Sequence, residues 1–236
     1  MLRLAARRAQ RVATGLASVT VHTLRTLVAL AIIAEAPAAD VVWRADLFTG
    51  SAWNAPVPVR IEQDGERTLD FTAEFTTRPW DAPPYYGARL GRWSDASAWE
   101  VEVVHHTMHL EDGPDEIQHL EITDGFNLVF VNRAEDFGWA VVRIGIGPLV
   151  THTVSEVRGR TRNRNGAFTT GDDGYDLSGA CAQLAVGRRH EIGRGWSALI
   201  EAKLVLAYAE DLPVAGGSFD LHHLSLHGDI GLGYAW

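Results

Sequence analysis

The sequence predicts an all-β fold, an eight-stranded antiparallel up-and-down β-barrel that spans a membrane. Three observations support this prediction: side chains alternate between apolar and polar over long segments, the N-terminal region has the composition of a secretory signal, and the chain ends on an aromatic residue, Trp236. Alternate side chains of a β-strand point to opposite faces. A strand in a closed membrane barrel presents apolar residues to the lipid and polar residues to the interior.

The segment 219–236 shows this alternation most clearly. Large apolar residues occupy one face, namely Leu224, Leu226, Ile230, Leu232, Tyr234 and Trp236. Small or polar residues occupy the other face, namely His223, Ser225, His227, Asp229, Gly231, Gly233 and Ala235. We therefore expect this segment to be the closing strand of the barrel, with its polar face inside.

Residues 1–38 have the pattern of a signal peptide. Basic residues precede the short apolar run Leu27–Ala34, and the Ala-x-Ala motif at residues 36–38 is typical of a cleavage site. A membrane anchor and a start site further downstream are the alternatives, but the apolar run is much shorter than the ~20 residues that a membrane helix needs. We expect cleavage after Ala38 and export from the cytoplasm.

The remaining chain divides into a periplasmic lead-in, residues 39–66, and the outer-membrane β-barrel, residues 67–236. The expected strands cover residues 67–77, 85–93, 99–110, 119–132, 139–150, 175–188, 195–209 and 219–236. The connections alternate between short and long, as periplasmic turns and extracellular loops do in outer-membrane barrels. Both ends of the barrel sequence are then expected on the periplasmic side.

Charged residues in these strands fall on the face opposite the large aliphatic residues. They are Arg89, Glu100, Glu102, Glu121, Arg143, Glu201, Lys203 and Asp229. An eight-stranded barrel has room for side chains only, so we expect a paired network in place of an open channel. The chain has a formal net charge of −9 and no basic face with interleaved aromatic residues, which argues against nucleic-acid binding.

The C-terminal stretch Ile230–Trp236, the strand architecture and the signal together resemble those of the small eight-stranded outer-membrane barrels of Gram-negative bacteria. The resemblance covers roughly residues 67–236. It implies a location in the cell outer membrane and contact with outer-membrane lipid and lipopolysaccharide, and we expect a monomer. It does not specify a function, because this fold includes adhesins, structural proteins and lipid A enzymes.

Most of the histidines gather at the expected extracellular ends of the strands. They are His105, His106, His109, His119, His152, His222, His223 and His227. A polar, hydrogen-bonded barrel mouth accounts for such a cluster and predicts a structural or surface-interaction protein. A metal site is a second interpretation, in which His106 or His109 meets His119 across a hairpin, since imidazole suits zinc, copper or nickel. No residue pattern specifies a cofactor.

The pair formed by His223 and Ser225 supports a third interpretation, acyl transfer or hydrolysis. A nucleophilic serine needs an adjacent base, and the base needs an orienting carboxylate, for which Asp229 or Glu201 is available. The His-x-Ser pair resembles that of the outer-membrane lipid A deacylases, and the resemblance makes His223 the base and Ser225 the nucleophile. This chain departs from that pattern, because the pair lies on the final strand and no Asn follows Ser225.

The sequence therefore favours a non-enzymatic outer-membrane barrel with a histidine-rich mouth. A lipid A-modifying acyl hydrolase or acyltransferase is one alternative, and a metal-binding surface barrel is the other.

Overall fold

The computed structural model describes residues 41–162 and 174–236, so the predicted signal peptide lies outside the described residues. Regular structure in these two ranges is β-strand, and they contain no helix long and apolar enough to cross a membrane. The strands are β1 (Val41–Asn54), β2 (Val57–Gln63), β3 (Leu69–Thr76), β4 (Tyr86–Ser94), β5 (Ser97–Asp112), β6 (Ile117–Asp136), β7 (Val141–Thr151), β8 (Val154–Val157), β9 (Arg160–Arg162), β10 (Asp176–Gly193), β11 (Trp196–Val214) and β12 (Gly217–Ala235).

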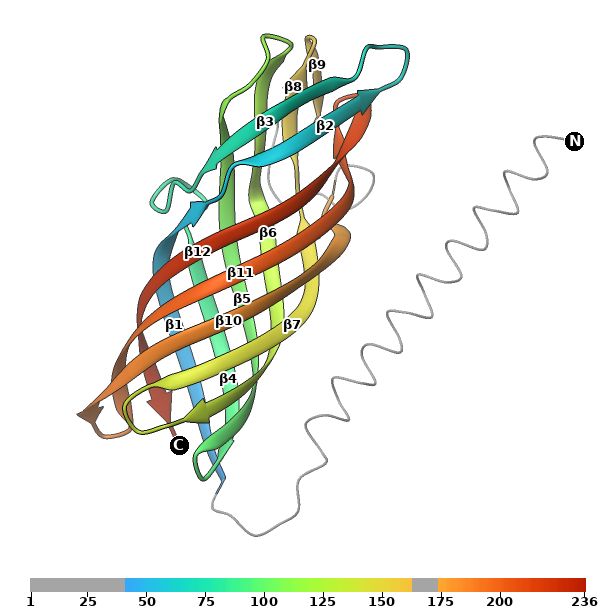
Figure 1. The fold of residues 1–236 in the computed structure, drawn as a ribbon. Helices are drawn as coiled ribbons and strands as arrows, with labels where there is room; N and C mark the ends of the chain where they lie inside the picture. Colours follow the sequence, from blue (N-terminus) through green and yellow to red (C-terminus); the bar gives the residue numbers. More distant parts are fainter. Residues whose placement is uncertain (1–40, 163–173) are drawn as a thin grey trace, which may run out of the picture. The chain divides into compact units, whose positions relative to one another are not determined.

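Antiparallel pairings among β1, β4, β5, β6, β7, β10, β11 and β12, taken in this order, form a closed cycle, because β12 pairs back with β1 (Figure 1). The closing ladder runs from the pair Arg44↔Ala235 to the pair Asn54↔Ser225. At one end of the cycle the backbones of Trp43 and Trp236 exchange two hydrogen bonds of 3.0 Å. We call this cycle the barrel, and the end at Trp236 the terminal end.

The first strand of the barrel differs from the predicted one. Residues 41–54 were expected in a lead-in ahead of the barrel, but they form β1 and pair with both β4 and β12. Residues 67–77 were expected as the first barrel strand, but β3 lies there and pairs with β2. The apolar alternation in β1 is weak, because Leu47 points outward and its neighbour Phe48 points inward, and a polar or glycine residue follows at each of positions 49–51.

The described chain also has more strands than the eight predicted, because the strands continue beyond the barrel into a second region (Figure 1). There β2 pairs with β3 and β12, β3 pairs with β5, and β8 pairs with β6 and β9. We call this region the head and define it as residues 57–76, 108–122, 154–162 and 209–221. Much of the predicted loop 210–218 is strand, since only the turn Ala215-Gly216 separates β11 from β12, and Gly216 has a positive φ of 77°.

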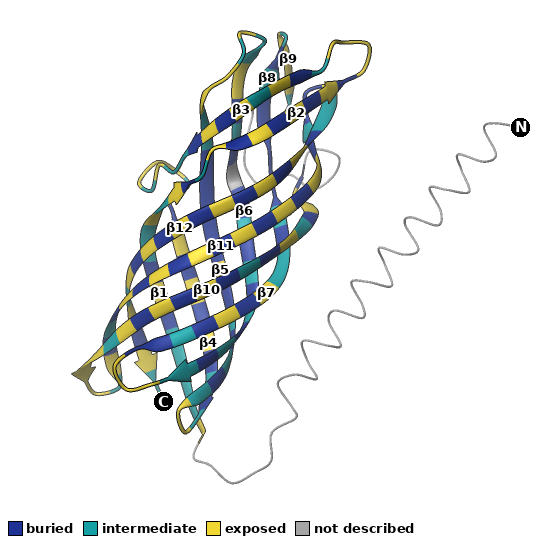
Figure 2. Ribbon diagram, viewed as in Figure 1, coloured by how far each residue is buried: buried dark blue, intermediate teal, exposed yellow. Residues whose placement is uncertain are grey.

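Side chains in the barrel alternate between exposed and buried, as Figure 2 shows along the strands. The exposed set is aliphatic and includes Leu47, Leu90, Ile144, Ile146, Leu184, Ile200, Leu204, Leu206, Leu226, Ile230 and Leu232. The buried set contains charged residues, namely Asp46, Arg89, Glu100, Glu102, Arg143, Glu201, Lys203 and Asp229, together with some apolar ones. The predicted orientation, with aliphatic residues outside and charged residues inside, is confirmed for seven of the eight charged residues. It is wrong on β6, where Glu121 is partly exposed and the large apolar residues Phe126, Leu128 and Phe130 are buried.

The interior of the head is apolar. Its buried side chains are Val57, Val59, Ile61, Leu69, Ala73, Phe75, Met108, Leu120, Ile122, Val157, Leu212, Val214, Phe219 and Leu221. At the far end of the head, polar contacts join the turns. Arg158 donates to the carbonyl oxygen of Arg67 over 2.7 Å and contacts the side-chain oxygen of Gln63, whose amide donates to the carbonyl oxygen of Ala215 over 2.6 Å. These contacts hold the tips of three hairpins together.

Candidate functional site

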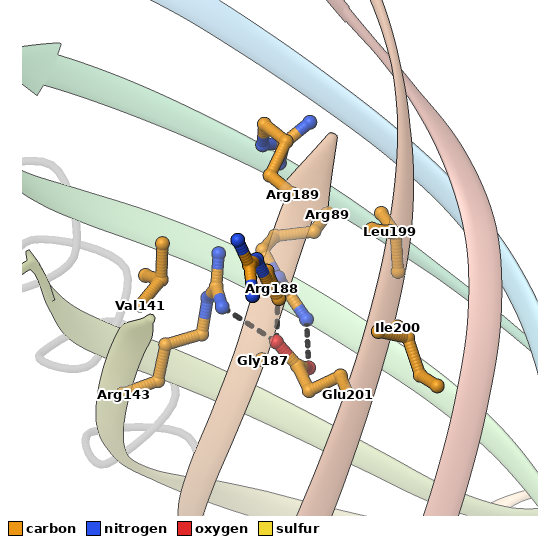
Figure 3. Close-up of a pocket in the computed structure, with 9 residues that line it drawn as sticks. All are labelled: Arg89, Val141, Arg143, Gly187, Arg188, Arg189, Leu199, Ile200 and Glu201. Carbon is orange, nitrogen blue, oxygen red and sulfur yellow. Dashed lines mark hydrogen bonds and ion pairs between the residues drawn. The ribbon is translucent and has the colours of Figure 1, made fainter. Parts of the chain in front are cut away.

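The interior of the barrel is filled by a network of charged side chains (Figure 3). Glu201 and Lys203 lie two residues apart on β11, so both point inward. The carboxylate of Glu201 accepts hydrogen bonds of 2.5 Å from Arg89 and from Arg143. The ammonium group of Lys203 lies 2.5 Å from a carboxylate oxygen of Glu102. Each of these buried charges therefore contacts an opposite charge, which offsets the cost of removing it from water.

The network leaves little free space. A cavity of about 10 Å³ lies between Arg89, Arg143 and Glu201, which is room for about one water molecule. Arg189 also lines this cavity (Figure 3). Its guanidinium lies 2.8 Å from both carboxylate oxygens of Asp46. At this level the barrel is a packed interior, as its strand number predicts.

Two hydroxyl groups and an imidazole form a hydrogen-bonded chain next to this network. The Ser225 hydroxyl lies 2.8 Å from Nε2 of His227, and the Tyr85 hydroxyl lies 2.7 Å from Nδ1 of the same ring. The alternation of β12 places Ser225 and His227 on the inward face, and Tyr85 reaches them from the residue just before β4. A hydroxyl beside an imidazole is the pairing that a nucleophile and its base require. Ser225 is 0 % exposed, however, so a substrate has no route to it.

His223 is not the partner of Ser225, contrary to the prediction. Neither ring nitrogen of His223 has a hydrogen-bond partner among the described residues, and the ring packs against Phe126 at 5.3 Å between centroids. His223 and His227 both lie two residues from Ser225, so strand alternation alone does not distinguish them. Tyr85 decides between them by holding the far nitrogen of His227. The symmetric sequence His-Leu-Ser-Leu-His over residues 223–227 was the signal that the prediction missed.

Asp229 does not act as the predicted orienting carboxylate. One of its oxygens lies 2.9 Å from the ammonium group of Lys203, so it belongs to the charged network. It is six residues from His223 along β12, which is about 20 Å in an extended strand. Glu201, the other candidate, binds Arg89 and Arg143. The predicted triad is therefore not assembled.

The structure brings together only two of the three predicted metal ligands. His109 and His119 converge on Glu121, with nitrogen-to-oxygen distances of 3.1 Å and 3.2 Å. His106 points into the interior, where its Nε2 lies 2.9 Å from the Thr77 hydroxyl. In residues 41–162 and 174–236 no three His, Cys, Asp or Glu side chains are placed to hold a metal ion. The two surface histidines bind a carboxylate in place of a metal.

Glu121 has an altered pKa because of this contact. Burial raises the pKa of its carboxyl group, but the hydrogen bonds from His109 and His119 outweigh burial and lower the pKa from 4.5 to about 2. The contact joins β5 to β6 inside the head, where His109 pairs directly with Glu121 in the strand ladder. It is therefore a stabilising contact between two strands of the head.

The predicted histidine-rich mouth is covered by the head. His106, His223 and His227 are buried in the interior that the strands enclose, whereas His119 and His222 are exposed on the outer surface. The expected strand topology places all of these side chains at the same end of the barrel. The continuation of the strands into the head then separates them into an inner and an outer group.

Comparisons with known proteins give matches only at the level of structure. No family model matches the sequence, and a search of curated proteins gives no match. Similar solved structures include the outer membrane protease OmpT from Escherichia coli (8% identity, 86% of this chain and 99% of that chain, TM-score 0.40), the outer membrane protein OprG from Pseudomonas aeruginosa (10%, 84% and 96%, 0.39) and Ail, the attachment invasion locus protein of Yersinia pestis (8%, 82% and 98%, 0.39). These values are too low to carry an argument about what this chain does.

Proposed function

We propose that this chain is a cell outer-membrane protein whose eight-stranded barrel spans the bilayer and holds the head at the cell surface, in a structural or surface-binding role. The observation that carries the proposal is the belt of exposed aliphatic side chains around a charged interior. Monomeric soluble proteins rarely expose a contiguous apolar surface of this kind. Lipid is the solvent that such a belt fits, because a bilayer favours apolar residues outside and tolerates paired charges inside.

Aromatic residues at the two edges of the belt support the same proposal. On β11, exposed Trp196 and Tyr208 bound the aliphatic run and lie twelve residues apart. That interval is about 40 Å along a strand, or about 30 Å along the membrane normal for a strand tilted by about 40°. The hydrocarbon core of a bilayer has a thickness of about 30 Å. The belt is thus the right height for one membrane.

The turns indicate which end of the barrel faces the periplasm. Residues 95–96 join β4 to β5 and residues 194–195 join β10 to β11, both at the terminal end. Outer-membrane barrels have short turns on the periplasmic side. The head is at the opposite end and is therefore assigned to the outside of the cell.

The packed interior favours a surface role over transport or catalysis. The charged network occupies the space that a channel needs, and the Ser225 hydroxyl has no access for an acyl chain. The head, by contrast, is a closed element built from continuous strands, so it presents its outer face in a fixed orientation. The belt would contact the acyl chains of membrane lipid and lipopolysaccharide. In the described part of the chain each barrel strand pairs with a neighbour on both sides, so the barrel itself has no free edge for a second copy, which supports a monomer.

Cysteine labelling on intact cells tests both the location and the orientation. Asp64→Cys places a thiol at an exposed turn of the head, and Ala96→Cys places one at an exposed turn of the terminal end. We expect the protein to require detergent for extraction, and a maleimide on a large polyethylene glycol chain to label Asp64→Cys on intact cells. Ala96→Cys should be labelled only after the outer membrane is permeabilised. The wild type is the control, since its single cysteine, Cys181, is buried.

Extraction without detergent would refute the membrane assignment. Labelling of Ala96→Cys on intact cells, with Asp64→Cys protected, would refute the orientation.

Lipid A analysis tests the enzymatic alternative. Because Ser225 is sealed inside, we expect lipid A from cells that express the wild type or Ser225→Ala to give the same mass spectrum. A lipid A species with a lost or gained acyl chain, present with the wild type and absent with Ser225→Ala, would contradict the non-enzymatic proposal.

A further inference from the structure

Three imidazole rings pack together in the part of the barrel interior that lies toward the head. The ring of His106 on β5 lies 4.9 Å from that of His227 and 5.8 Å from that of His223, both on β12, measured between centroids. All three side chains are almost completely buried. The cluster thus joins a strand on one side of the interior to a strand on another.

The ring nitrogens of this cluster have few hydrogen-bond partners. His106 uses only Nε2, on the Thr77 hydroxyl, and its Nδ1 has no partner among the described residues. His223 has none for either nitrogen, and Phe126 packs against the rings of both His106 and His223. In the described part of the chain no carboxylate forms a hydrogen bond or an ion pair with any ring of the cluster. A proton added here would have no counter-charge in contact.

Charged and titratable groups of the described residues surround the cluster, but none of them places a counter-charge in contact with a ring. The charged groups around His227 are Lys203 on β11, Glu102 on β5 and Asp229 on β12. Both carboxylates contact the ammonium group of Lys203, and Asp229 also interacts with the Tyr85 hydroxyl. His106 faces the other two rings of the cluster and the ring of Tyr85, whereas its neighbour His105 stacks on Tyr86.

The strand ladders are irregular at the same level. The registers shift between His106 and Met108 on β5, between Leu177 and Gly179 on β10, and between Ala209 and Leu212 on β11. These positions are connected through the ladders, because Gly179 pairs with Ala209, and Phe126 pairs with His106 on one side and Thr151 on the other. A register shift leaves residues without regular pairing, so the wall has fewer backbone hydrogen bonds here. Local opening favours such places.

We propose that the cluster of His106, His223 and His227 is an acid-sensitive joint, whose protonation loosens the packing of the head on the barrel. Imidazolium ions at these separations repel each other, and an apolar wall screens that repulsion poorly. The opened joint lets water reach the rings, so the open state binds more protons than the closed state. Opening is then favoured as the pH falls below about 6.5, where an accessible histidine becomes protonated. This acid response depends on packing within the chain and does not require a ligand on the head.

Hydrogen exchange of the purified full-length protein in detergent tests this joint. We expect exchange in residues 209–221 of the head, corrected for the intrinsic effect of pH, to be faster by about tenfold at pH 5.5 than at pH 7.5, since each unit of pH below about 6.5 gives this factor for each extra proton bound. Exchange in residues 196–206 of the barrel should change little. Equal acceleration in both segments would indicate general unfolding and would overturn the proposal, as would no acceleration in either.

Substitutions then assign the effect to the cluster. His223→Leu removes one titratable ring without removing a hydrogen bond, so the acid response should decrease while the protein remains folded at pH 7.5. Adding His106→Gln should abolish most of the remainder. His222→Gln, at the exposed neighbouring position, is the matched control and should respond as the wild type does. A full acid response in His223→Leu, or its loss in His222→Gln, would overturn the assignment even if the double variant does not fold.

Discussion

The barrel and the head have opposite interiors, although the same strands build both. On β12 the inward residues are apolar in the head, at Phe219 and Leu221, and polar in the barrel, from His223 to Asp229. The outward residues change in the opposite sense, from Asp220 in the head to Leu226 in the barrel. This strand therefore fits two different surroundings along its length. In the head, which water surrounds, apolar side chains lie inside, and in the barrel, which fits lipid, polar and charged side chains lie inside.

The difference extends to how each region is held together. Contacts in the head are numerous and non-directional, so the loss of one apolar side chain affects its neighbours gradually. The barrel depends on a few charges that must all be paired, because an unpaired charge in the interior has no water to solvate it. Substitutions in the two regions should therefore differ in their cost.

The largest effect is expected from Lys203→Met in the barrel. Lys203 is 1 % exposed and lies within 3.5 Å of carboxylate oxygens of Glu102, Glu201 and Asp229. Its removal leaves an excess of buried negative charge and should cost about 3–5 kcal/mol. Urea unfolding in detergent micelles, followed by tryptophan fluorescence, measures this cost.

Arg60→Met is the matched control in the head. Arg60 also pairs with a carboxylate, that of Glu62, but both side chains are 64% exposed. Its removal should change the stability by less than about 1 kcal/mol. Equal costs for Lys203→Met and Arg60→Met would show that the buried network contributes no more than a surface ion pair, and would remove the contrast between the two regions.

The next effect is expected from Leu212→Ala in the head. Leu212 is fully buried in the apolar interior, so truncation should cost about 2–5 kcal/mol through lost burial and the cavity that remains. The loss should be local, with the head cleaved faster by a protease while the barrel remains intact. Leu206→Ala on the same strand is the control, because Leu206 lies on the exposed belt and should have little effect in micelles. Cleavage of the barrel at the same rate would show that the two regions unfold as one unit.

The sequence predicts most of the barrel but little of the head. Period-two alternation predicts the inward face of β11 and β12, because large aliphatic residues alternate with polar or charged ones over residues 200–204 and 224–230. It fails for β1, where Leu47 and Phe48 are adjacent and both apolar. It also fails beyond Ala209, where the register shift before Leu212 changes which residues point inward. Short apolar runs such as Val57–Ile61 do not reveal their partners, since β2 pairs with β12 from the far end of the chain.

The candidate site was predictable in content but not in its contacts. Alternation places His223, Ser225 and His227 on one inward face, which the structure has. The choice of His227 as the partner of Ser225 depends on Tyr85, which is 142 residues away from His227 in the sequence. The separation of His106 from His109 depends on the register shift in β5, for which the sequence has no clear signal.

The smallest effect is expected from Glu121→Gln, which tests whether a surface charge in the head acts as weakly as the contrast implies. The folded-state pKa of Glu121 is lowered to about 2, so its contribution to stability is present above pH 4.5 and is lost as the pH falls toward 2. Because 20% of the side chain is exposed to water, we expect a loss of less than about 1 kcal/mol at neutral pH. The difference between the wild type and the variant should shrink as the pH falls through this window, when measured by urea unfolding. Glu62→Gln, on an exposed pair, is the control; a difference for Glu121→Gln that persists at pH 2 would show that shape, and not charge, stabilises this contact.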